Sequence, residues 1–204
     1  MTIDVLLGKK FIHNLLISEA GIEMCELGCS TGYVSRSLAK QFPKSTFYGY
    51  DIAEDAIDFA NKQAALEGQS NVKFFVQDCC NMPEEWTGKW EYILALDLVH
   101  DVPSTTSVLR EICRVLKPGC IASIIDIDMH SNIEDNRNSP MAAFIYSISL
   151  AHCMTVSLAE GGQGLGAAWG REKAIEMIKE AGFTSVEPLS TPNDKLLVHY
   201  LCSH

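Results

Sequence analysis

The chain has 204 residues, of which 47% are hydrophobic and 21% are charged, a composition typical of one folded domain with a substantial core. It carries 26 acidic and 16 basic residues, so its net charge is −10, and the basic residues are scattered along the chain. A field of this sign repels polyanions, which disfavours nucleic acid or an anionic membrane as the main partner.

The composition also predicts a cytoplasmic protein. We expect no membrane span, which needs roughly 18 uncharged apolar residues, and the first ten residues lack the basic start of a signal peptide. The eight cysteines form no CxxC pair and are expected to be reduced core thiols. The adjacent Cys79 and Cys80 could bind a soft metal or metalloid, or could simply mark the end of a strand.

The first two thirds of the chain predict alternating helices and strands. Helices are expected at 3–18, 33–41, 53–67 and 104–116, and short apolar strands at 22–26, 46–50, 71–77, 92–96 and 120–127. Ser104 is the expected N-cap of the fourth helix, and the triplet at 117–119 is expected to separate that helix from the fifth strand. This alternation implies an α/β fold with a mostly parallel sheet and helices on both faces.

The pattern changes after Asp128. A polar segment at 129–140, an apolar helix at 141–158 and a glycine-rich segment at 160–170 predict an inserted cap or lid over 129–170. A helix at 171–181 and strands at 183–189 and 195–202 follow, and the short link between these strands permits only an antiparallel pair. We therefore expect a single domain over 1–204, with an N-terminal helix within 1–20.

A small-residue turn follows the first strand, in the stretch ELGCSTG at 26–32. Such a turn lets a ligand approach the backbone, and the following helix N-terminus adds hydrogen-bond donors, although a tight turn without a ligand is the alternative.

Asp51 ends the second strand, where an acid can accept both hydroxyls of a ribose. Asp78 ends the third strand, where a carboxylate and the following amides can meet an adenine edge. Together these features predict an adenosine pocket.

Glu26 discriminates between adenosine ligands. A pyrophosphate at this turn would meet its carboxylate, and close like charges in a partly buried site are costly. The dinucleotide fingerprint GxGxxG also fails, because the stretch from Gly28 reads GCSTGY. A ligand with an ammonium and a sulfonium beside its adenosine fits better, which indicates S-adenosyl-L-methionine.

These motifs resemble the class I S-adenosylmethionine-dependent methyltransferases over residues 22–202. ELGCSTG is similar to the family's E/DxGxGxG motif, with Ser30 at the middle glycine, and YGYDIAEDAIDFA, VQDCC, EYILALDLVHDV and LREICRVLKPGCIASIIDI match the segments that follow. The resemblance implies a Rossmann-like seven-stranded sheet of order 3-2-1-4-5-7-6 with a C-terminal antiparallel hairpin, S-adenosyl-L-methionine as cofactor and S-adenosyl-L-homocysteine as product. The implied cofactor-binding residues are Glu26, Gly28, Cys29, Ser30, Gly32, Asp51, Ile52, Asp78, Cys79 and Asp97.

Two further segments, HDVP at 100–103 and SLAEGGQGLGAAWG at 157–170, resemble a small-molecule branch of bacterial and invertebrate methyltransferases. The resemblance implies a small-molecule methyl acceptor. Members of this branch usually carry an N-terminal winged-helix-like dimerisation domain, for which we expect no room in this chain. Either a monomer or a homodimer therefore remains open.

Methyl transfer from a sulfonium is an in-line displacement, so the enzyme aligns the reactants and removes a proton where the nucleophile requires it. His100 follows the fourth strand and is the candidate general base, since its ordinary pKa suits neutral pH; shaping the turn is the alternative. Asp101 would orient His100 or cap the next helix.

Three residues of the last third are weaker candidates for substrate contact. His130 follows the fifth strand, His152 lies on the apolar helix, where a core histidine is the alternative, and Trp169 could stack on a substrate or only pack the cap. The glycines at 161–166 could form a mobile lid or a surface loop.

Other functions stay open at this point. The chain could bind the cofactor without turnover, as a regulatory partner of a methyltransferase, or could be an NAD(P)-dependent oxidoreductase. An arsenite methyltransferase would require at least two of Cys29, Cys79 and Cys80 to converge on one site. We predict no metal cofactor.

Overall fold

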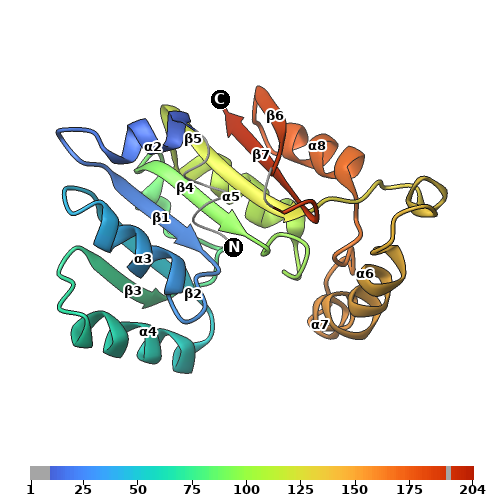
Figure 1. The fold of residues 1–204 in the computed structure, drawn as a ribbon, viewed down its shortest axis with the longest axis horizontal. Coiled ribbons are helices and arrows are strands. Elements are labelled where there is room, and N and C mark those ends of the chain that lie inside the picture. Colours follow the sequence, from blue (N-terminus) through green and yellow to red (C-terminus); the bar gives the residue numbers. More distant parts are fainter. Residues whose placement is uncertain (1–9, 192–193) are drawn as a thin grey trace.

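A computed structural model describes residues 10–191 and 194–204, with the side chains of residues 10 and 11 excepted. One seven-stranded sheet has the order β3-β2-β1-β4-β5-β7-β6 (Figure 1). Its strands are β1 (Glu23–Leu27), β2 (Thr46–Asp51), β3 (Val72–Val76), β4 (Trp90–Leu96), β5 (Leu116–Ile127), β6 (Ser185–Ser190) and β7 (Leu197–Ser203). The first five strands pair in parallel, while β7 pairs antiparallel with both β5 and β6. The predicted fold class and strand order are confirmed.

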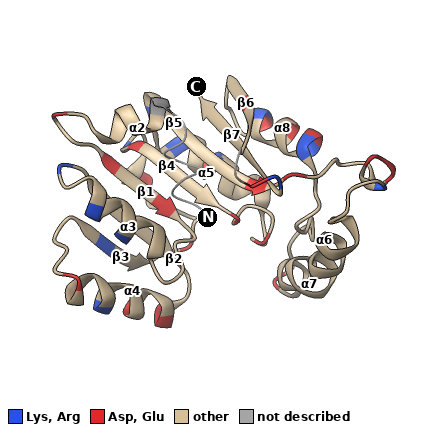
Figure 2. Cartoon of the chain, viewed as in Figure 1, with Lys and Arg blue, Asp and Glu red and all other residues tan. Residues whose placement is uncertain are grey.

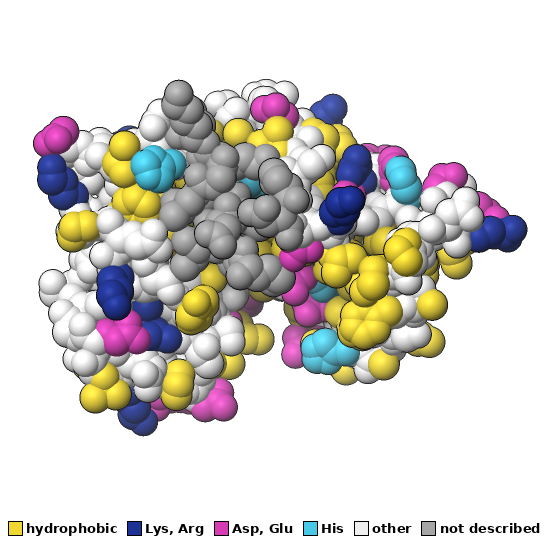
Figure 3. All heavy atoms as spheres, viewed as in Figure 1, with side chains coloured by type: hydrophobic (Ala, Val, Ile, Leu, Met, Phe, Trp, Pro, Cys, Tyr) yellow, Lys and Arg dark blue, Asp and Glu magenta, His cyan; other side chains and the backbone are white. Residues whose placement is uncertain are grey.

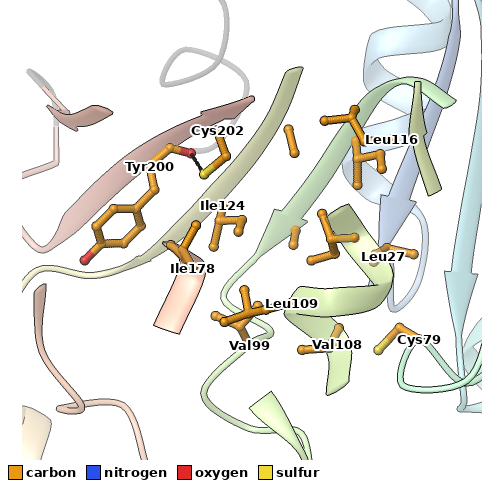
Figure 4. Close-up of a cluster of buried hydrophobic side chains, with 14 of the residues drawn as sticks. Leu27, Cys79, Val99, Val108, Leu109, Leu116, Ile124, Ile178, Tyr200 and Cys202 are labelled. Atoms are coloured by element: carbon orange, nitrogen blue, oxygen red, sulfur yellow. Dashed lines mark hydrogen bonds between the residues drawn. The ribbon is translucent and has the colours of Figure 1, made fainter. Parts of the chain in front are cut away.

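Helices cover both faces of this sheet. The core on one face joins the sheet to α2 (Lys10–Leu16), α3 (Tyr33–Gln41) and α4 (Glu54–Leu66). The core on the other face joins it to α5 (Thr105–Val115) and α8 (Arg171–Glu180), and Figure 4 shows Leu109 of α5 and Ile178 of α8 on the same side of the sheet as Ile124 of β5. The central strands are buried on both faces, which explains their continuous apolar sequences.

Most predicted elements are present, and the differences are local. Ser104 caps α5, since its hydroxyl accepts a hydrogen bond from the Ser107 amide at 3.2 Å. The triplet at 117–119 does not separate α5 from β5 as predicted; it lies within β5, because Leu116 already pairs with Trp90 and the pairing shifts before Tyr92. A short 3₁₀ helix at Glu84–Trp86 was not predicted. Residues 3–9 of the predicted first helix lie outside the described residues.

The segment after β5 forms a cap that projects beyond the carboxyl end of the sheet (Figure 1). It contains a 3₁₀ turn (Ile133–Asn136) and a continuous helix made of α6 (Ala142–Ile148), a π-helical segment (Ser149–Cys153) and α7 (Met154–Ala159). This helix carries no Lys, Arg, Asp or Glu (Figure 2). Many of its apolar side chains are exposed, among them Phe144 and Leu150, and Figure 3 shows hydrophobic side chains gathered on this part of the surface.

The expectation that no segment could span a membrane is wrong by length and composition. The 18 residues of Ala142–Ala159 have a mean hydropathy of 1.5, and 22% of them are buried. Serine, threonine and histidine interrupt the apolar residues here, but no charge does, so the helix passes the criterion that a membrane span must meet.

Candidate active site

A cavity of about 470 Å³ opens at the carboxyl ends of β1, β2, β3 and β4, below the cap. The molecule is visibly hollowed between the cap and the body that contains the sheet (Figure 3). The lining residues are Gly28, Tyr50, Asp51, Ile52, Gln77, Asp78, Cys79, Cys80, Leu98, Asp101, Val102, Pro103, Ser104, Val156 and Glu160. This is the edge at which open α/β sheets bind their ligands, and the volume lies within the usual range for small-molecule sites, roughly 300–1,000 Å³.

The turn between β1 and α3 forms one end of the cavity. Gly28 and Gly32 have φ of 67° and 72°, and a Cβ atom at Gly32 would lie 2.5 Å from the Phe74 ring. Ser30 also has positive φ, at 47°, and its amide donates to Asp51 Oδ2 at 2.8 Å. The close approach at Gly32 and the contact from Asp51 explain why this turn is built largely from small residues.

Asp51 holds the turn as well as lining the cavity. Its second oxygen, Oδ1, accepts a hydrogen bond from the Ala53 amide at 2.9 Å. Each carboxylate oxygen has two lone pairs, so both oxygens can accept a further hydrogen bond from a ligand hydroxyl. The predicted ribose acid is therefore held by two backbone amides in an orientation compatible with that role.

Glu26 lies at the base of the same turn, 3% exposed, and is not among the lining residues. Its Oε2 accepts hydrogen bonds from both the amide and the hydroxyl of Ser35, in the first turn of α3. Burial raises the pKa of Glu26 to about 7, and the hydrogen bonds from Ser35 offset part of that rise. The carboxyl group of Glu26 thus lies directly behind the turn and titrates near neutral pH.

The loop after β3 forms the opposite wall of the cavity. Asp78 is exposed and its Oδ1 accepts a hydrogen bond from the Cys80 amide at 2.8 Å. The Sγ atoms of Cys79 and Cys80 lie within 4.8 Å of each other, and the interaction between the two thiols holds the pKa of Cys79 above its usual range and that of Cys80 below it. Figure 4 shows Cys79 beside Val108 of α5.

Cys29 does not reach this wall. It packs in the core on the opposite face of the sheet from Cys79, and it is absent from the described lining residues. Cys29 therefore does not converge with the other two cysteines, whereas Cys79 and Cys80 lie together and meet the minimum of two thiols that the arsenite hypothesis requires. The side chain of Cys29, which the resemblance implies to contact the cofactor, does not line the cavity.

His100 is surrounded by carboxylates. Its Nδ1 lies 2.7 Å from Asp126 Oδ1, and its Nε2 lies 3.2 Å from Asp101 Oδ1. Burial lowers the pKa of His100, but the charges and hydrogen bonds of Asp126 and Asp101 outweigh it and hold the pKa well above its usual range. A doubly protonated ring has no lone pair with which to accept a proton or bind a metal. The geometry favours a positioning role for His100, which is buried and outside the cavity lining.

Asp101 is the member of this cluster that lines the cavity. Burial raises its pKa, but His100, whose Nε2 lies 3.2 Å from Asp101 Oδ1, lowers the pKa by more, so that it lies below its ordinary value. The Cys153 thiol of the cap lies within 4.8 Å of this carboxylate and also lowers its pKa. A charged carboxylate thus lines the cavity.

The predicted site residue Ile52 lines the cavity, whereas Asp97, His130, His152 and Trp169 lie outside the lining. Asp97 has φ of 52°, and one of its oxygens lies 3.9 Å from His100 Nδ1. His130 Nδ1 lies 2.8 Å from Glu172 Oε1, and His152 is exposed on the cap, contrary to its reading as a core residue. Trp169 is 6% exposed and packs in the hydrophobic core, so it is placed to stabilise the fold and not to stack on a substrate.

The glycine-rich segment packs closely against the cavity rim. The Gln163 amide donates to the Pro103 carbonyl at 3.1 Å, and a Cβ atom at Gly162 would lie 2.4 Å from the same oxygen. Glycine is required there because the two backbones touch. A mobile lid stays a prediction.

Several lining residues were not predicted. Tyr50, Gln77, Cys80, Leu98 and Ser104 adjoin predicted strand ends or a predicted cap, so their positions carried a usable signal. Val156 and Glu160 come from the cap helix, more than 50 residues along the chain from Leu98, and no local pattern indicates that they form the roof.

Comparison with known proteins decides the family. The model of a methyltransferase domain family matches residues 18–182, which is most of the chain. The chain belongs to the class I S-adenosylmethionine-dependent methyltransferases. This membership and the antiparallel end of the sheet reject the oxidoreductase alternative, and S-adenosyl-L-methionine is the family's cofactor.

Curated relatives of this methyltransferase are longer proteins. The chain is 29% identical over 100 residues to a ubiquinone biosynthesis O-methyltransferase of Xanthomonas oryzae, which covers 49% of the chain. It is 29% identical over 172 residues to a sterol 24-C-methyltransferase of Gibberella zeae, which covers 84% of the chain. The match spans 41% of the length of each of these relatives.

Solved structures share the fold. A SAM-dependent methyltransferase from Aquifex aeolicus has a TM-score of 0.67 at 16% identity, and the match covers 98% of this chain and 90% of that one. An O-methyltransferase family protein from Burkholderia thailandensis also has a TM-score of 0.67, at 17% identity, over 98% of this chain and 57% of the other. At these identities the likeness establishes the architecture alone.

Proposed function

We propose that this methyltransferase domain transfers a methyl group from S-adenosyl-L-methionine to an uncharged small-molecule acceptor with an apolar body. One observation carries the proposal. A single cavity joins the predicted adenosine-side residues Gly28, Asp51 and Asp78 to Asp101 and to the cap residue Glu160. Cofactor and acceptor can therefore meet in one cavity.

The cofactor side of the cavity is suited to a cationic adenosine ligand. Asp51 keeps lone pairs free for two ribose hydroxyls, and Asp78 stands at the next strand end. Behind the turn, Glu26 adds a buried carboxyl group whose charge a cationic tail would stabilise. Bound S-adenosyl-L-methionine supplies a methyl group that its sulfonium already activates.

Asp101 is the group we assign to the acceptor's proton. The carboxylate can accept a hydrogen bond from an acceptor hydroxyl and so align its oxygen for attack. A weak base suffices, because a hydroxyl that is gaining a methyl group becomes far more acidic than a carboxylic acid as the bond forms. His100 keeps Asp101 charged and oriented, which revises the predicted base role of His100 into a positioning one.

The charge of the lining indicates the acceptor class. Four carboxylates, those of Asp51, Asp78, Asp101 and Glu160, line the cavity, and among the described lining residues there is no Lys, Arg or His. An acidic wall of this kind repels a carboxylate or phosphate on the acceptor. Apolar contacts come from Leu98, Val102, Pro103 and Val156. The names of the ubiquinone and sterol relatives are consistent with an uncharged, apolar acceptor.

The proposal is tested with a panel of hydroxylated acceptors in matched neutral and carboxylated forms. We expect S-adenosylhomocysteine to accumulate with the neutral forms, and kcat/KM to be at least about tenfold lower with the anionic forms, a difference of about 1.4 kcal/mol. Equal turnover of both forms would contradict the acceptor class. Cofactor binding without turnover of any member of the panel would instead support the silent regulatory partner.

The role of Asp101 is tested by Asp101→Asn, with the exposed cap variant Asp135→Asn as control. Asp101→Asn should lower kcat by at least about tenfold, while the affinity for S-adenosylhomocysteine stays within about threefold. His100→Gln should lower kcat and shift its pH profile, because it changes the pKa of Asp101. An unchanged kcat in Asp101→Asn would remove Asp101 from the reaction.

A further inference from the structure

Two thiols and a carboxylate meet in the cavity wall just after β3. The Sγ atoms of Cys79 and Cys80 and a carboxylate oxygen of Asp78 all lie within 4.8 Å of one another. All three residues line the cavity, in which Cys79 is 7% exposed and Cys80 is half-buried. We propose that Asp78, Cys79 and Cys80 form a binding site for a soft, thiophilic cation, and that this cation and the cofactor exclude each other.

The loop that carries these ligands is held in place by its own hydrogen bonds. The Gln77 side-chain amide donates to the carbonyl of Asp78 and to that of Asn81, both at 2.9 Å. One oxygen of Asp78 accepts the Cys80 amide at 2.8 Å, which leaves the other oxygen to face a ligand. The backbone therefore does not need to rearrange for the three ligand atoms to converge.

The donor set selects the kind of cation. Thiolate ligands favour zinc, copper(I) and similar soft ions, whereas magnesium and calcium require oxygen ligands. A tetrahedral site with metal–sulfur bonds of about 2.3 Å needs ligand atoms about 3.8 Å apart, which small side-chain rotations can reach from the observed spacing. Each thiol gives its proton to solvent when it binds the cation.

Exclusion follows from the position of the site. The same cavity contains Asp51 and Gly28, and Asp78 is the residue proposed to face the adenine. A cation held by Asp78 would occupy that region and withdraw its carboxylate. The exclusion rests on the proposed function, because it requires the cofactor to lie in this cavity, whereas the cation site itself does not.

The test adds Cd²⁺, the probe cation, to the reduced full chain and follows thiolate-to-metal charge-transfer absorption and calorimetric binding. We expect one tight equivalent of Cd²⁺, at least a tenfold loss of affinity in Cys80→Ser and in the double variant Cys79→Ser with Cys80→Ser, and no competition by Mg²⁺. The control variant replaces Cys113 and Cys120, two half-buried thiols outside the cavity, and should bind Cd²⁺ as the wild type does. Thermal unfolding checks that each variant is folded.

S-adenosylhomocysteine at saturation should weaken Cd²⁺ binding at least tenfold, and Cd²⁺ should weaken S-adenosylhomocysteine binding by the same factor. Unchanged Cd²⁺ affinity in folded Cys80→Ser, or displacement by Mg²⁺, would overturn the cation site. Simultaneous binding of both ligands would overturn the exclusion. If the chain binds Cd²⁺ through these thiols but binds no S-adenosylhomocysteine, the proposed function fails and the cation site stands.

Discussion

His100 and Asp126 form a buried ion pair. The Nδ1 atom of His100 lies 2.7 Å from Oδ1 of Asp126, and the two residues are 3% and 1% exposed. Asp126 belongs to β5, while His100 lies in the loop that follows β4, so the pair ties the loop that carries Asp101 to the sheet. The position of the proposed acceptor-side carboxylate therefore depends on a residue that does not line the cavity.

Asp126→Asn should destabilise the fold and misplace Asp101. Removing one partner of a buried pair leaves an uncompensated charge, which costs roughly 3–5 kcal/mol of the free energy of unfolding. Urea unfolding measures this cost, and the exposed variant Asp135→Asn is the control, with an expected change within about 0.5 kcal/mol. A similar effect from both variants would show that the pair does not stabilise the protein.

The stability of the protein should fall as the pH rises from about 7 to 8. The pKa of His100 is raised in the folded state, so its contribution is fully present below the unfolded pKa near 6.5 and is lost toward the folded pKa. The window of pH 7 to 8 is chosen because Glu26, whose pKa is about 7, titrates at its lower end and cysteines of the unfolded chain titrate above it, near pH 8.5. Unfolding free energies should decrease by up to about 1.4 kcal/mol per pH unit in the wild type, and His100→Gln should remove that slope. A wild type with no slope would mean that His100 is not charged.

Glu26→Gln should stabilise the protein without ligand at pH 8. The pKa of Glu26 is raised in the folded state, so its charged form is disfavoured by folding above about pH 7, and this cost is absent below the unfolded pKa near 4.5. Glutamine keeps an acceptor for Ser35 without the charge, so we expect a gain of roughly 1–3 kcal/mol at pH 8 and none near pH 4.5.

The same Glu26→Gln variant should bind S-adenosylhomocysteine at least about tenfold more weakly by calorimetry, if Glu26 stabilises the cationic tail. The exposed variant Glu19→Gln should change neither quantity. A gain in stability with unaltered ligand affinity would remove Glu26 from the cofactor site.

Gly32→Ala tests the packing of the turn between β1 and α3, and Gly68→Ala, just past the end of α4, is its matched control. Both glycines have φ near 70°, but a Cβ atom at Gly68 meets nothing within 4 Å, whereas one at Gly32 would lie 2.5 Å from Phe74. Gly68→Ala should cost about 1 kcal/mol, the cost of left-handed backbone alone. Gly32→Ala should cost roughly 2–4 kcal/mol and weaken cofactor binding, because the collision moves the turn. Thermal unfolding with calorimetric titration checks both, and equal costs would contradict the packing argument.

Patterns that act within one element were readable from the sequence. The alternation of strands and helices, the Ser104 cap and the antiparallel hairpin depend on local spacing and on link length. The charge state of His100 was not readable, because Asp126, its nearest carboxylate partner, lies 26 residues away in β5. The burial of Trp169 was hidden for a similar reason, since it packs in a core built by α5 and α8. More of the predicted cofactor-binding residues than of the predicted catalytic and substrate residues line the cavity, because the former adjoin strand ends.

The π-helical segment Ser149–Cys153 has a consequence for how the cap can change. Five residues there complete a wider turn, so the helix that follows is rotated by about 100° relative to an uninterrupted α-helix. That rotation sets which side chains of α7 face the cavity, and at present Val156 of α7 and Glu160, which directly follows α7, line it. Deleting a single residue from the segment would turn different side chains toward the cavity. A change of one residue in the cap can thus replace the side chains that α7 directs toward the cavity, while the sheet and the turn after β1 stay the same.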